Sequence, residues 1–414
     1  MSVHSACPRP PVAHRGAAAL AGLVTLAMAA TGCTVSSASG GPSRQQDTQA
    51  ASPTSNAPRV SETSVSINVR NGADNIPVDK VVKIEVADGS FDEVAVIIGR
   101  GTKRLEGQIS GNGTRWIATQ RLEPGVRYRT RAEAVDADGL PVTATSVFRA
   151  SELTLDEQAF PSIAPLAGET VGVGMPVIVQ FDVPVTNRRN IEEHLSVESS
   201  PRQAGAWSWL SDNEVHWRPK TYWKPGTEVT VDADINSVAA GKGIFGQQSR
   251  ATSFTIGDAV VSKIDVTKHR MRVFRSGTLL RTLPITAGKN GFVTRSGTKV
   301  IMEKLRYKTM DAATIGISKD DPEYYAIDVE YAMRVTYSGE FIHGAPWSAG
   351  SQGSDNVSHG CVGMSMADAA WLFDVSKRGD VVHVTGTGRA LEPGNGYTDW
   401  NKSFAEYREG SAFS

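Results

Sequence analysis

The sequence predicts a mainly β protein built from several domains. Short segments rich in Val, Ile, Thr and aromatic residues follow one another from about residue 62, and Asn-Gly, Asp-Gly and Pro-Gly pairs separate them. This pattern is typical of β-sandwiches with tight turns. The composition is globular, with 40% hydrophobic and 21% charged residues, and a length of 414 residues exceeds one ordinary domain. The formal net charge of −1 argues against a nucleic-acid partner, which usually requires a basic face.

Residues 1–32 have the features of a lipoprotein signal peptide. Arg9 and Arg15 precede an unbroken run of small and apolar residues, Gly16 to Ala30, which is too short to span a membrane comfortably. The run ends at Ala30-Thr-Gly-Cys33, which resembles the lipobox of bacterial lipoproteins, where the cysteine carries the lipid. That motif most often has leucine in place of Ala30, so ordinary cleavage that leaves Cys33 as a free thiol stays the alternative. We expect an exported protein, anchored by lipid to the cell membrane and facing the cell wall and periplasmic space.

Residues 33–61 are rich in Ser, Ala, Gly, Gln, Thr and Pro, and this composition predicts a flexible tether. Two strand-rich stretches follow, at residues 62–149 and 150–257, and we interpret each as a β-sandwich module. The strands predicted for the first module are Val65 to Val69, Val81 to Val86, Val94 to Ile98, Trp116 to Thr119 and Tyr128 to Ala134. Those predicted for the second are Val177 to Asp182, Glu214 to Trp217, Thr227 to Asp232 and Thr252 to Thr255.

The second stretch also contains a cluster of aromatic residues, namely Trp207, Trp209, Trp217, Tyr222 and Trp223. A cluster of this kind can form a sugar-stacking surface, but aromatic side chains more often fill the core of a small sandwich. We favour the core interpretation. His216 lies on a predicted strand beside these aromatics, and we expect its side chain to face outward.

A third β-rich domain is predicted at residues 258–385. Its expected strands are Val260 to Val266, Arg270 to Phe274, Leu279 to Ile285, Val300 to Met302, Tyr325 to Val329, Met333 to Tyr337 and Val381 to Val384. Arg275-Ser-Gly277 is expected to join the second and third of these in a hairpin. Ser365-Met-Ala-Asp368 predicts a capped helix that runs to about Lys377.

Residues 386–414 form a C-terminal extension. Trp400, Phe404 and Tyr407 are spaced so that they share one face of a short helix. We expect this extension to dock across the third domain and the second module. A membrane-surface role is the alternative, although the opposite face is not notably basic.

One stretch near the C-terminal end carries the chemistry. Cys361 is the only cysteine beyond residue 33, and it ends the sequence Ser358-His-Gly-Cys361. His343 lies upstream, at the end of an apolar run. A lone thiol with a histidine elsewhere in the sequence is typical of a cysteine nucleophile. Gly360 allows a tight turn, so that consecutive amides can point at one developing oxyanion.

Two other interpretations of these residues are weaker. Cys361, His359 and His343 could be metal ligands, but a structural zinc site usually has four protein ligands and no fourth is obvious nearby. Cys361 could also be an inert buried thiol. The polar residues that flank it are unlike a core strand.

His343, fourteen intervening residues and then Ser-His-Gly-Cys361 resemble the active-site motif of the YkuD-type L,D-transpeptidases, which cross-link peptidoglycan. Two immunoglobulin-like modules before a catalytic domain resemble the multi-domain members of actinobacterial type. The resemblance implies the fold class: two immunoglobulin-like β-sandwich modules, a YkuD-type β-rich catalytic domain with a short helix after the nucleophile, and a C-terminal docking tail.

The resemblance also implies roles for individual residues. His343 is the base for the Cys361 nucleophile, and the carbonyl of Gly344 orients its imidazole. The amides of His359, Gly360 and Cys361 supply the oxyanion site, Tyr325 adds a hydroxyl, and Ser358 and His359 hold the loop. The residues implied to line the donor pocket and its lid are Met310, Tyr325, Ser338 and Trp347.

The implied reaction is acyl transfer from a tetrapeptide stem to the side-chain amine of an acceptor stem, which forms a 3→3 cross-link through a Cys361 thioester. It needs no metal and no cofactor. The implied partners are peptidoglycan stem peptides, with β-lactams of the carbapenem class as covalent inhibitors.

Gly363 departs from the family motif, which usually has asparagine two residues after the cysteine. Glycine there leaves more room and a more mobile loop, and we expect Gly363→Asn to speed acylation by a carbapenem. The missing amide keeps hydrolysis of tetrapeptide stems open as an alternative activity. A non-catalytic cell-wall-binding lipoprotein is the alternative from another class.

Overall fold

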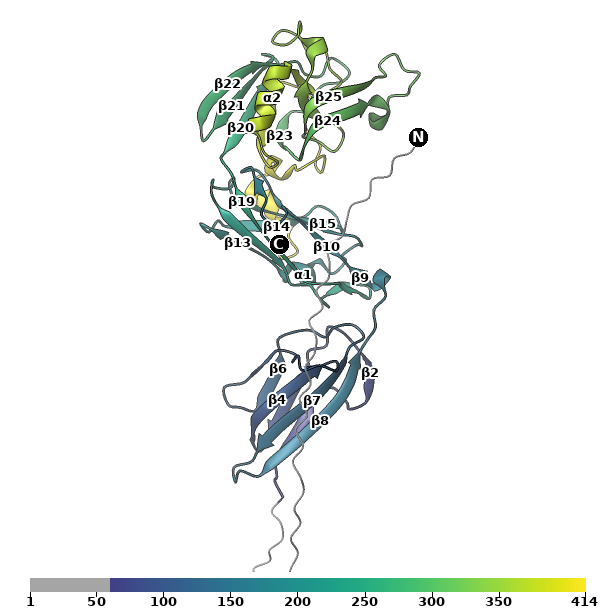
Figure 1. The fold of residues 1–414 in the computed structure, drawn as a ribbon, viewed down its shortest axis with the longest axis vertical. Coiled ribbons are helices and arrows are strands. Elements are labelled where there is room, and N and C mark those ends of the chain that lie inside the picture. Colours follow the sequence, from purple (N-terminus) through teal and green to yellow (C-terminus); the bar gives the residue numbers. More distant parts are fainter. Residues whose placement is uncertain (1–59) are drawn as a thin grey trace, which may run out of the picture. The chain divides into compact units, whose positions relative to one another are not determined.

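The computed structural model describes residues 60–414, and Figure 1 shows its strands and helices. The first module is a sandwich of two four-stranded sheets, with strand orders β1-β3-β6-β5 and β2-β8-β7-β4. Its strands are β1 (Ser64–Ile67), β2 (Ala73–Ile76), β3 (Lys83–Ala87), β4 (Ser90–Ile98), β5 (Gly107–Ile109), β6 (Arg115–Ala118), β7 (Arg127–Val135) and β8 (Pro141–Ala150). All five strands predicted here exist, and Trp116, Tyr128 and Phe148 are buried between the sheets.

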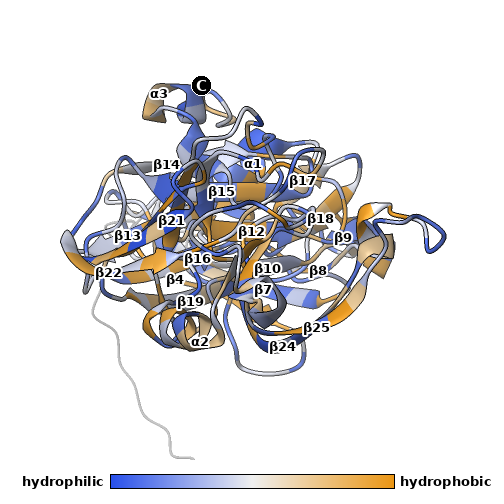
Figure 2. Ribbon diagram, turned by 90° about the horizontal axis from the view of Figure 1, so that it is seen from above, coloured by the Kyte–Doolittle hydropathy of each residue, from blue (hydrophilic) through white to orange (hydrophobic). Residues whose placement is uncertain are grey.

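The second module has two four-stranded sheets, β10-β12-β15-β14 and β11-β19-β16-β13, and a small sheet β17-β18-β9. Its elements are η1 (Leu155–Glu157), β9 (Gln158–Ala159), β10 (Pro161–Ala164), β11 (Thr170–Val171), β12 (Val177–Phe181), α1 (Arg188–Glu192), β13 (Leu195–Ser200), β14 (Gly205–Trp209), β15 (Glu214–Pro219), β16 (Glu228–Ala233), β17 (Ala239–Gly241), β18 (Ile244–Gly246) and β19 (Arg250–Ile256). The apolar run of β12 appears as a hydrophobic strand in Figure 2.

The aromatic cluster of this module belongs to its core, as predicted. Trp207, Trp209, Trp217 and Trp223 are each at most 8% exposed, and Tyr222 packs partly buried against them. The expectation for His216 is wrong. Its side chain is fully buried between Glu214 and Asp399 because the C-terminal extension covers the strand face on which it lies.

The third domain consists of a five-stranded sheet, β22-β21-β20-β28-β23, and a four-stranded sheet, β24-β25-β26-β27. The elements are β20 (Val260–Asp265), β21 (Arg270–Arg275), β22 (Thr278–Pro284), β23 (Gly297–Val300), β24 (Glu303–Asp311), η2 (Ala312–Ile315), β25 (Ala326–Arg334), β26 (Phe341–Gly344), η3 (Pro346–Ser348), β27 (Val362–Met364), α2 (Met366–Val375) and β28 (Val381–Thr385). Ser276 and Gly277 both have positive φ in the predicted β21–β22 hairpin.

The strand and helix bounds predicted for this domain need correction. The segment predicted as a strand at 325–329 and the start of the one predicted at 333–337 belong to a single strand, β25, which passes through Tyr331 at a φ of 56° and ends at Arg334. The long strand β24 was not predicted, because its charged and exposed residues hide the alternation. The helix α2 begins as expected after Ser365, whose side chain accepts a hydrogen bond from the Asp368 amide, but it ends at Val375.

Between the two sheets and α2 lies one apolar core, which includes Ile264, Met271, Ile342, Met364 and Leu372. The last strands of the second sheet, β26 and β27, run through this core in parallel. They therefore hold the segments around residues 343 and 361 at fixed positions.

The C-terminal extension folds into two short helices, η4 (Asp399–Asn401) and α3 (Phe404–Arg408), and not into the single helix expected. The predicted aromatic face still forms, because the rings of Trp400, Phe404 and Tyr407 all pack on the guanidinium of Arg218 in the second module. The Asn401 side chain accepts a hydrogen bond from the amide of Thr298 in the third domain. The extension thus docks on both domains, as expected.

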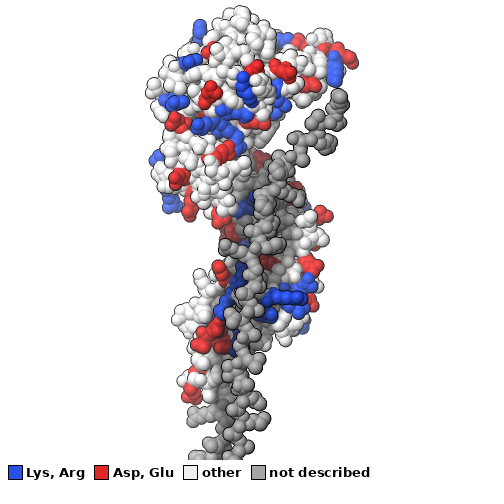
Figure 3. All heavy atoms as spheres, in the orientation of Figure 1, with Lys and Arg blue, Asp and Glu red and all other residues white. Residues whose placement is uncertain are grey.

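No helix within residues 60–414 combines the length and the apolar character that crossing a membrane requires. On the face shown in Figure 3, positive and negative side chains are interspersed. This distribution agrees with the nearly balanced composition of 43 Lys and Arg against 44 Asp and Glu.

Candidate active site

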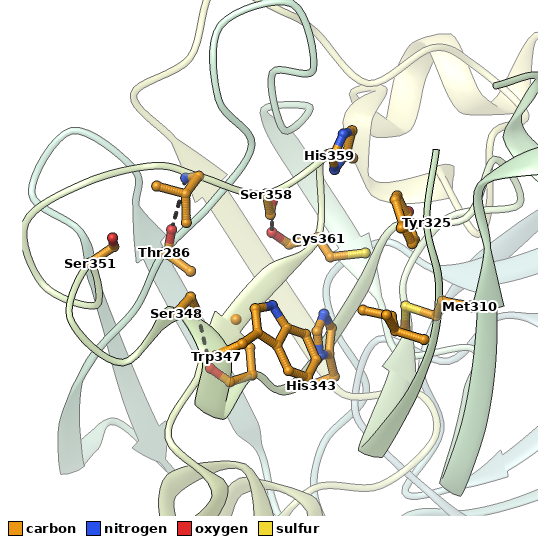
Figure 4. Close-up of a pocket in the computed structure, with 14 residues that line it drawn as sticks. Thr286, Met310, Tyr325, His343, Trp347, Ser348, Ser351, Ser358, His359 and Cys361 are labelled. Carbon is orange, nitrogen blue, oxygen red and sulfur yellow. Dashed lines mark hydrogen bonds between the residues drawn. The ribbon is translucent and has the colours of Figure 1, made fainter. Parts of the chain in front are cut away.

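Cys361 and His343 are brought together by two parallel strands. Cys361 directly precedes β27, and His343 lies on β26 with Gly363 as its register partner. Both side chains are largely buried, with Cys361 8% and His343 4% exposed. They open into a pocket of about 450 Å³. Figure 4 shows both side chains in this pocket.

The imidazole of His343 is held in one tautomer. Its Nδ1 lies 2.8 Å from the backbone carbonyl oxygen of Gly344. A carbonyl only accepts, so Nδ1 carries the hydrogen and Nε2 keeps a free lone pair. The Trp347 ring stacks on the imidazole at a centroid distance of 5.9 Å. Burial lowers the pKa of His343, so the ring is neutral at pH 7 and able to accept a proton.

The Cys361 sulfur contacts backbone groups of Gly339 and Phe341. The amide of Phe341 donates to Sγ at 3.4 Å, and Sγ faces the carbonyl oxygen of Gly339 at 3.6 Å. In Figure 4 the sulfur points toward Tyr325, away from His343. Burial raises the pKa of the thiol to about 11. The resting site therefore holds a neutral thiol and a neutral imidazole.

Ser358 shapes the turn that carries Cys361. Its hydroxyl donates to the Cys361 carbonyl oxygen at 2.6 Å and accepts from the Gly360 amide at 3.1 Å. Gly360 has a φ of +119°, which favours glycine. The expectation that all three amides serve an oxyanion needs correction, since the Gly360 amide is already bonded to Ser358. The amides of His359 and Cys361 are the remaining candidates.

Most of the other predicted residues line the same pocket: Met310, Tyr325, Trp347, Ser358, His359 and Gly363. Ser338 does not line it. Ser338 lines an adjacent hollow of about 160 Å³ and accepts a hydrogen bond from the side chain of Asn395. The two hollows share Met310 and Tyr325, so Ser338 lies next to the Cys361 pocket.

The His359 side chain is directed away from the sulfur. Its Nε2 lies 2.7 Å from a carboxylate oxygen of Glu323, and its ring packs against Phe292 and Tyr325. Lys289 donates to both oxygens of the same carboxylate, at 2.9 and 2.6 Å. His359 therefore ties the nucleophile turn to the segment between β24 and β25. It does not converge with Cys361 and His343 in the way that a metal site would require.

The expectation of extra room and mobility at Gly363 is wrong. Gly363 lies within β27 and exchanges two backbone hydrogen bonds of 2.9 Å with Thr286. A Cβ atom at this position would lie 2.9 Å from the Ala345 Cβ and 3.1 Å from the Thr286 Cγ2. Neighbouring side chains have filled the space that a larger residue would take.

Some pocket residues were not found from the sequence. Thr286, Ser348 and Ser351 add hydroxyl groups to the wall of the pocket. Thr286 follows a predicted strand directly, and a polar residue there is a signal that could have found it. The two serines belong to the connection between the predicted His343 and Cys361 segments, and their spacing carries no comparable signal.

The fold and the site together define an enzyme-like domain, preceded by immunoglobulin-like modules, in which a histidine on one strand lies beside a cysteine that directly precedes the adjacent parallel strand. Comparison with known proteins finds two families in the chain, in the same order. The family described as "L,D-transpeptidase catalytic domain" matches residues 259–384, and the family described as "Bacterial Ig domain" matches residues 73–239.

Known relatives extend this similarity over most of the chain. L,D-transpeptidase 2 of Mycobacterium tuberculosis is 35% identical over 349 residues, which is 84% of this chain and 85% of the relative. L,D-transpeptidase 1 of the same organism is 38% identical over 264 residues, which is 63% of this chain and 98% of that one. The chain belongs to the L,D-transpeptidase family.

A solved structure of an L,D-transpeptidase in complex with imipenem shares 37% sequence identity and superimposes with a TM-score of 0.49. The match covers 55% of this chain and 99% of the chain of the solved structure. The family and the fold class predicted from the sequence are confirmed by the sequence comparisons.

Proposed function

We propose that this L,D-transpeptidase forms 3→3 cross-links in peptidoglycan through a thioester on Cys361. One observation carries the proposal: His343 lies beside the only cysteine of the described residues, and the Gly344 carbonyl leaves its Nε2 free as a base. A cysteine with a nearby, oriented imidazole is the arrangement of nucleophilic acyl transfer.

The acylation step begins with rotation of the Cys361 side chain from Phe341 toward His343. The sulfur attacks the carbonyl carbon between the third residue of the donor stem and its terminal D-Ala, and Nε2 of His343 takes the thiol proton. The oxyanion lies near the amides of His359 and Cys361 and the Tyr325 hydroxyl. The C–N bond then breaks, His343 returns the proton to the departing D-Ala amine, and the thioester remains.

The transfer step reverses this proton movement. The side-chain amine of the third residue of an acceptor stem attacks the thioester carbonyl and gives a proton to His343. The C–S bond breaks, and the sulfur takes the proton back from His343 as the amide cross-link forms. No redox partner enters either step, and each step conserves its protons.

The ionisation of the pair supports this order of events. A thiol with a pKa raised to about 11 is protonated at pH 7, so the thiolate forms during attack and is not present beforehand. The buried imidazole has a lowered pKa and is therefore unprotonated and ready to accept. Catalysis by a positioned general base contributes about 10²- to 10⁴-fold to such steps.

We further propose that carbapenems acylate Cys361. Relatives are described in complex with imipenem and with a faropenem-derived adduct. A strained β-lactam carbonyl would meet the same sulfur and the same base as the stem carbonyl. The pocket, about 450 Å³, is large enough for a ligand of that size.

The site of action proposed for the enzyme is the outer face of the cell membrane. The support is the sequence Ala30-Thr-Gly-Cys33, which lies outside the described residues. A lipidated Cys33 would hold the enzyme beside the cell wall. The native protein should then partition into a detergent phase, and Cys33→Ala should move it to the aqueous phase or block processing. Aqueous partitioning of the unmutated mature protein would refute the anchor.

Intact-mass analysis with tetrapeptide stems tests the activity. The protein is expected to gain the mass of the stem minus that of D-Ala, and a cross-linked dimer of stems is expected as product. Cys361→Ser is expected to give neither, with unchanged circular dichroism. Tripeptide without dimer would show hydrolysis in place of cross-linking. The absence of both adduct and product with folded protein would favour a non-catalytic role.

A further inference from the structure

A buried ion pair lies directly behind the nucleophile. Lys299 on β23 and Glu340, which precedes β26, have side chains that are 1% and 5% exposed, and the ammonium donates to Oε2 of the carboxylate. Arg295, 13% exposed, donates to Oε1 from its guanidinium and from its own backbone amide, both at 3.0 Å. Burying three charges is costly unless they satisfy one another, and here they do.

The Glu340 carboxylate joins two segments, one of which contacts the Cys361 sulfur while the other contacts the turn that carries Cys361. On one side, the next residue is Phe341, whose amide donates to Cys361 Sγ at 3.4 Å. On the other side, Arg295 follows Thr294, whose hydroxyl donates to the Gly360 carbonyl oxygen at 2.8 Å. The Glu340 side chain also faces the turn itself, because a Cβ on Gly360 would lie 3.7 Å from its Cγ.

The same cluster contributes charge close to the sulfur. Burial is the largest influence on the thiol pKa and raises it; Glu340 raises it further, and Lys299 lowers it. The influence is mutual, since Cys361 favours the charged form of Lys299. The other titratable groups around Cys361 are the neutral His343 and Tyr325, and the surface set of His359, Glu323 and Lys289.

The charges of the cluster are balanced, with two cations and two carboxylates. Two cations, Lys299 and Arg295, face one carboxylate, and Arg295 has a second, half-exposed partner in Glu392. Lys299 has no second acid among the described ion pairs. Lys299 and Glu340 therefore act on the sulfur in opposite senses: the ammonium favours the thiolate and the carboxylate opposes it.

We propose that Lys299 and Glu340, together with Arg295, are positioning residues for the Cys361 nucleophile. Glu340 holds in place the contact of Phe341 with the Cys361 sulfur and the contact of Thr294 with Gly360. The Lys299 ammonium stabilises the thiolate. The inference rests on the proposed role of Cys361 and adds residues that the acyl-transfer steps above do not use.

The test is the pH dependence of Cys361 alkylation by iodoacetamide in the full-length protein, followed by mass spectrometry of the peptide that contains Cys361. The thiolate is the reactive form, so the profile follows its ionisation. Lys299→Met is expected to displace the profile toward higher pH by about one unit, which corresponds to about tenfold slower alkylation at pH 8. Glu340→Gln is expected to displace it toward lower pH.

Opposite displacements distinguish an electrostatic role from a structural one. If the role were purely structural, the alkylation profiles of both variants would move in the same direction or stay unchanged. Either result overturns the proposal. Lys299→Met combined with Glu340→Gln removes both charges. This double variant replaces Lys299→Met in the test if that single variant does not fold. Its alkylation profile is expected to lie between the profiles of the two single variants, and a profile outside that range contradicts the proposal.

Lys304→Met is the matched control. Lys304 is also a partly buried lysine of the same domain, but its ammonium donates to the carbonyls of Phe373 and Ser376 beside α2. It should lose stability without displacing the alkylation profile. Because alkylation needs no stem peptide, the profile can support the charge cluster even if the tetrapeptide experiment fails.

Discussion

His216 of the second module and Asp399 of the C-terminal extension form a fully buried pair, with 2.9 Å between Nδ1 and Oδ1. Glu214 accepts at the other ring nitrogen at 2.7 Å, and the Tyr407 hydroxyl donates to Asp399 at 3.1 Å. Burial alone would lower the pKa of His216, but the two carboxylates outweigh it and raise the pKa to about 9. The extension is thus held on the module by a charged imidazole.

Asp399→Asn is therefore expected to loosen the extension. Removing one partner of a buried ion pair costs about 3 kcal/mol, which corresponds to about 100-fold faster hydrogen exchange if the extension opens locally. The measurement is hydrogen exchange of residues 399–408. Glu409→Gln, at an exposed position of the same extension, is the control and should change little. Unchanged exchange in Asp399→Asn would show that the aromatic contacts to Arg218 suffice.

The same pair predicts a pH dependence. The folded-state pKa of His216 is raised above the unfolded value of about 6.5, so its stabilising contribution is complete below pH 6.5 and is lost as pH rises through about 9. Exchange of the extension should accelerate between pH 8 and 10 beyond the intrinsic increase. In Asp399→Asn this additional acceleration should be smaller, because Glu214 is then the only carboxylate paired with the imidazole.

Gly363→Asn is expected to slow acylation by a carbapenem by about tenfold, the opposite of the expectation from the sequence. The added Cβ would lie 2.9 Å from that of Ala345, so the backbone at Gly363 or at Ala345, two residues after His343, must shift. Intact-mass kinetics of adduct formation measure this. Ala345→Gly combined with Gly363→Asn relieves the closer contact and should recover part of the rate, with Ala345→Gly alone as the control. Faster acylation by Gly363→Asn alone would show that the strands yield easily.

The pH dependence of the acylation rate should show that the Cys361 thiol and the His343 imidazole are both neutral in the resting enzyme. With the His343 pKa below its ordinary value and the thiol at about 11, the rate should be flat from about pH 7 to 10 and fall only in acid, as the imidazole is protonated. A preformed thiolate and imidazolium would instead lose activity when the imidazolium deprotonates on the alkaline side. His343→Ala should lower the rate at pH 7 by about 10²- to 10⁴-fold.

Glu323→Gln is expected to weaken donor binding more than it slows the chemistry. Glu323 links Lys289 and His359 and lies two residues before Tyr325, which lines the pocket. Loss of its charge should free the segment between β24 and β25 and raise KM with little change in kcat. Asp320→Asn, in the same segment, is the control. A fall in kcat at constant KM would place Glu323 in the chemical step.

The order of β modules, the position of the nucleophile and the hairpin at Ser276 and Gly277 could be predicted from the sequence. These features depend on short-range patterns: alternating apolar residues, turn residues with positive φ, and the Ser-His-Gly-Cys361 motif. The cap at Ser365 was predictable for the same reason. The family resemblance added the pairing of Cys361 with His343, which their separation in sequence does not require.

Other features were decided by the tertiary structure alone. His216 became buried because a segment 183 residues later covers it, and Gly363 lost its room because Ala345 and Thr286 approach from other segments. Lys299 and Glu340 are ordinary charged residues in sequence, yet the packing of the two sheets places both behind Cys361. Local sequence patterns specify strands and turns, whereas burial, and with it pKa and charge pairing, depends on which distant segments exclude water from a site.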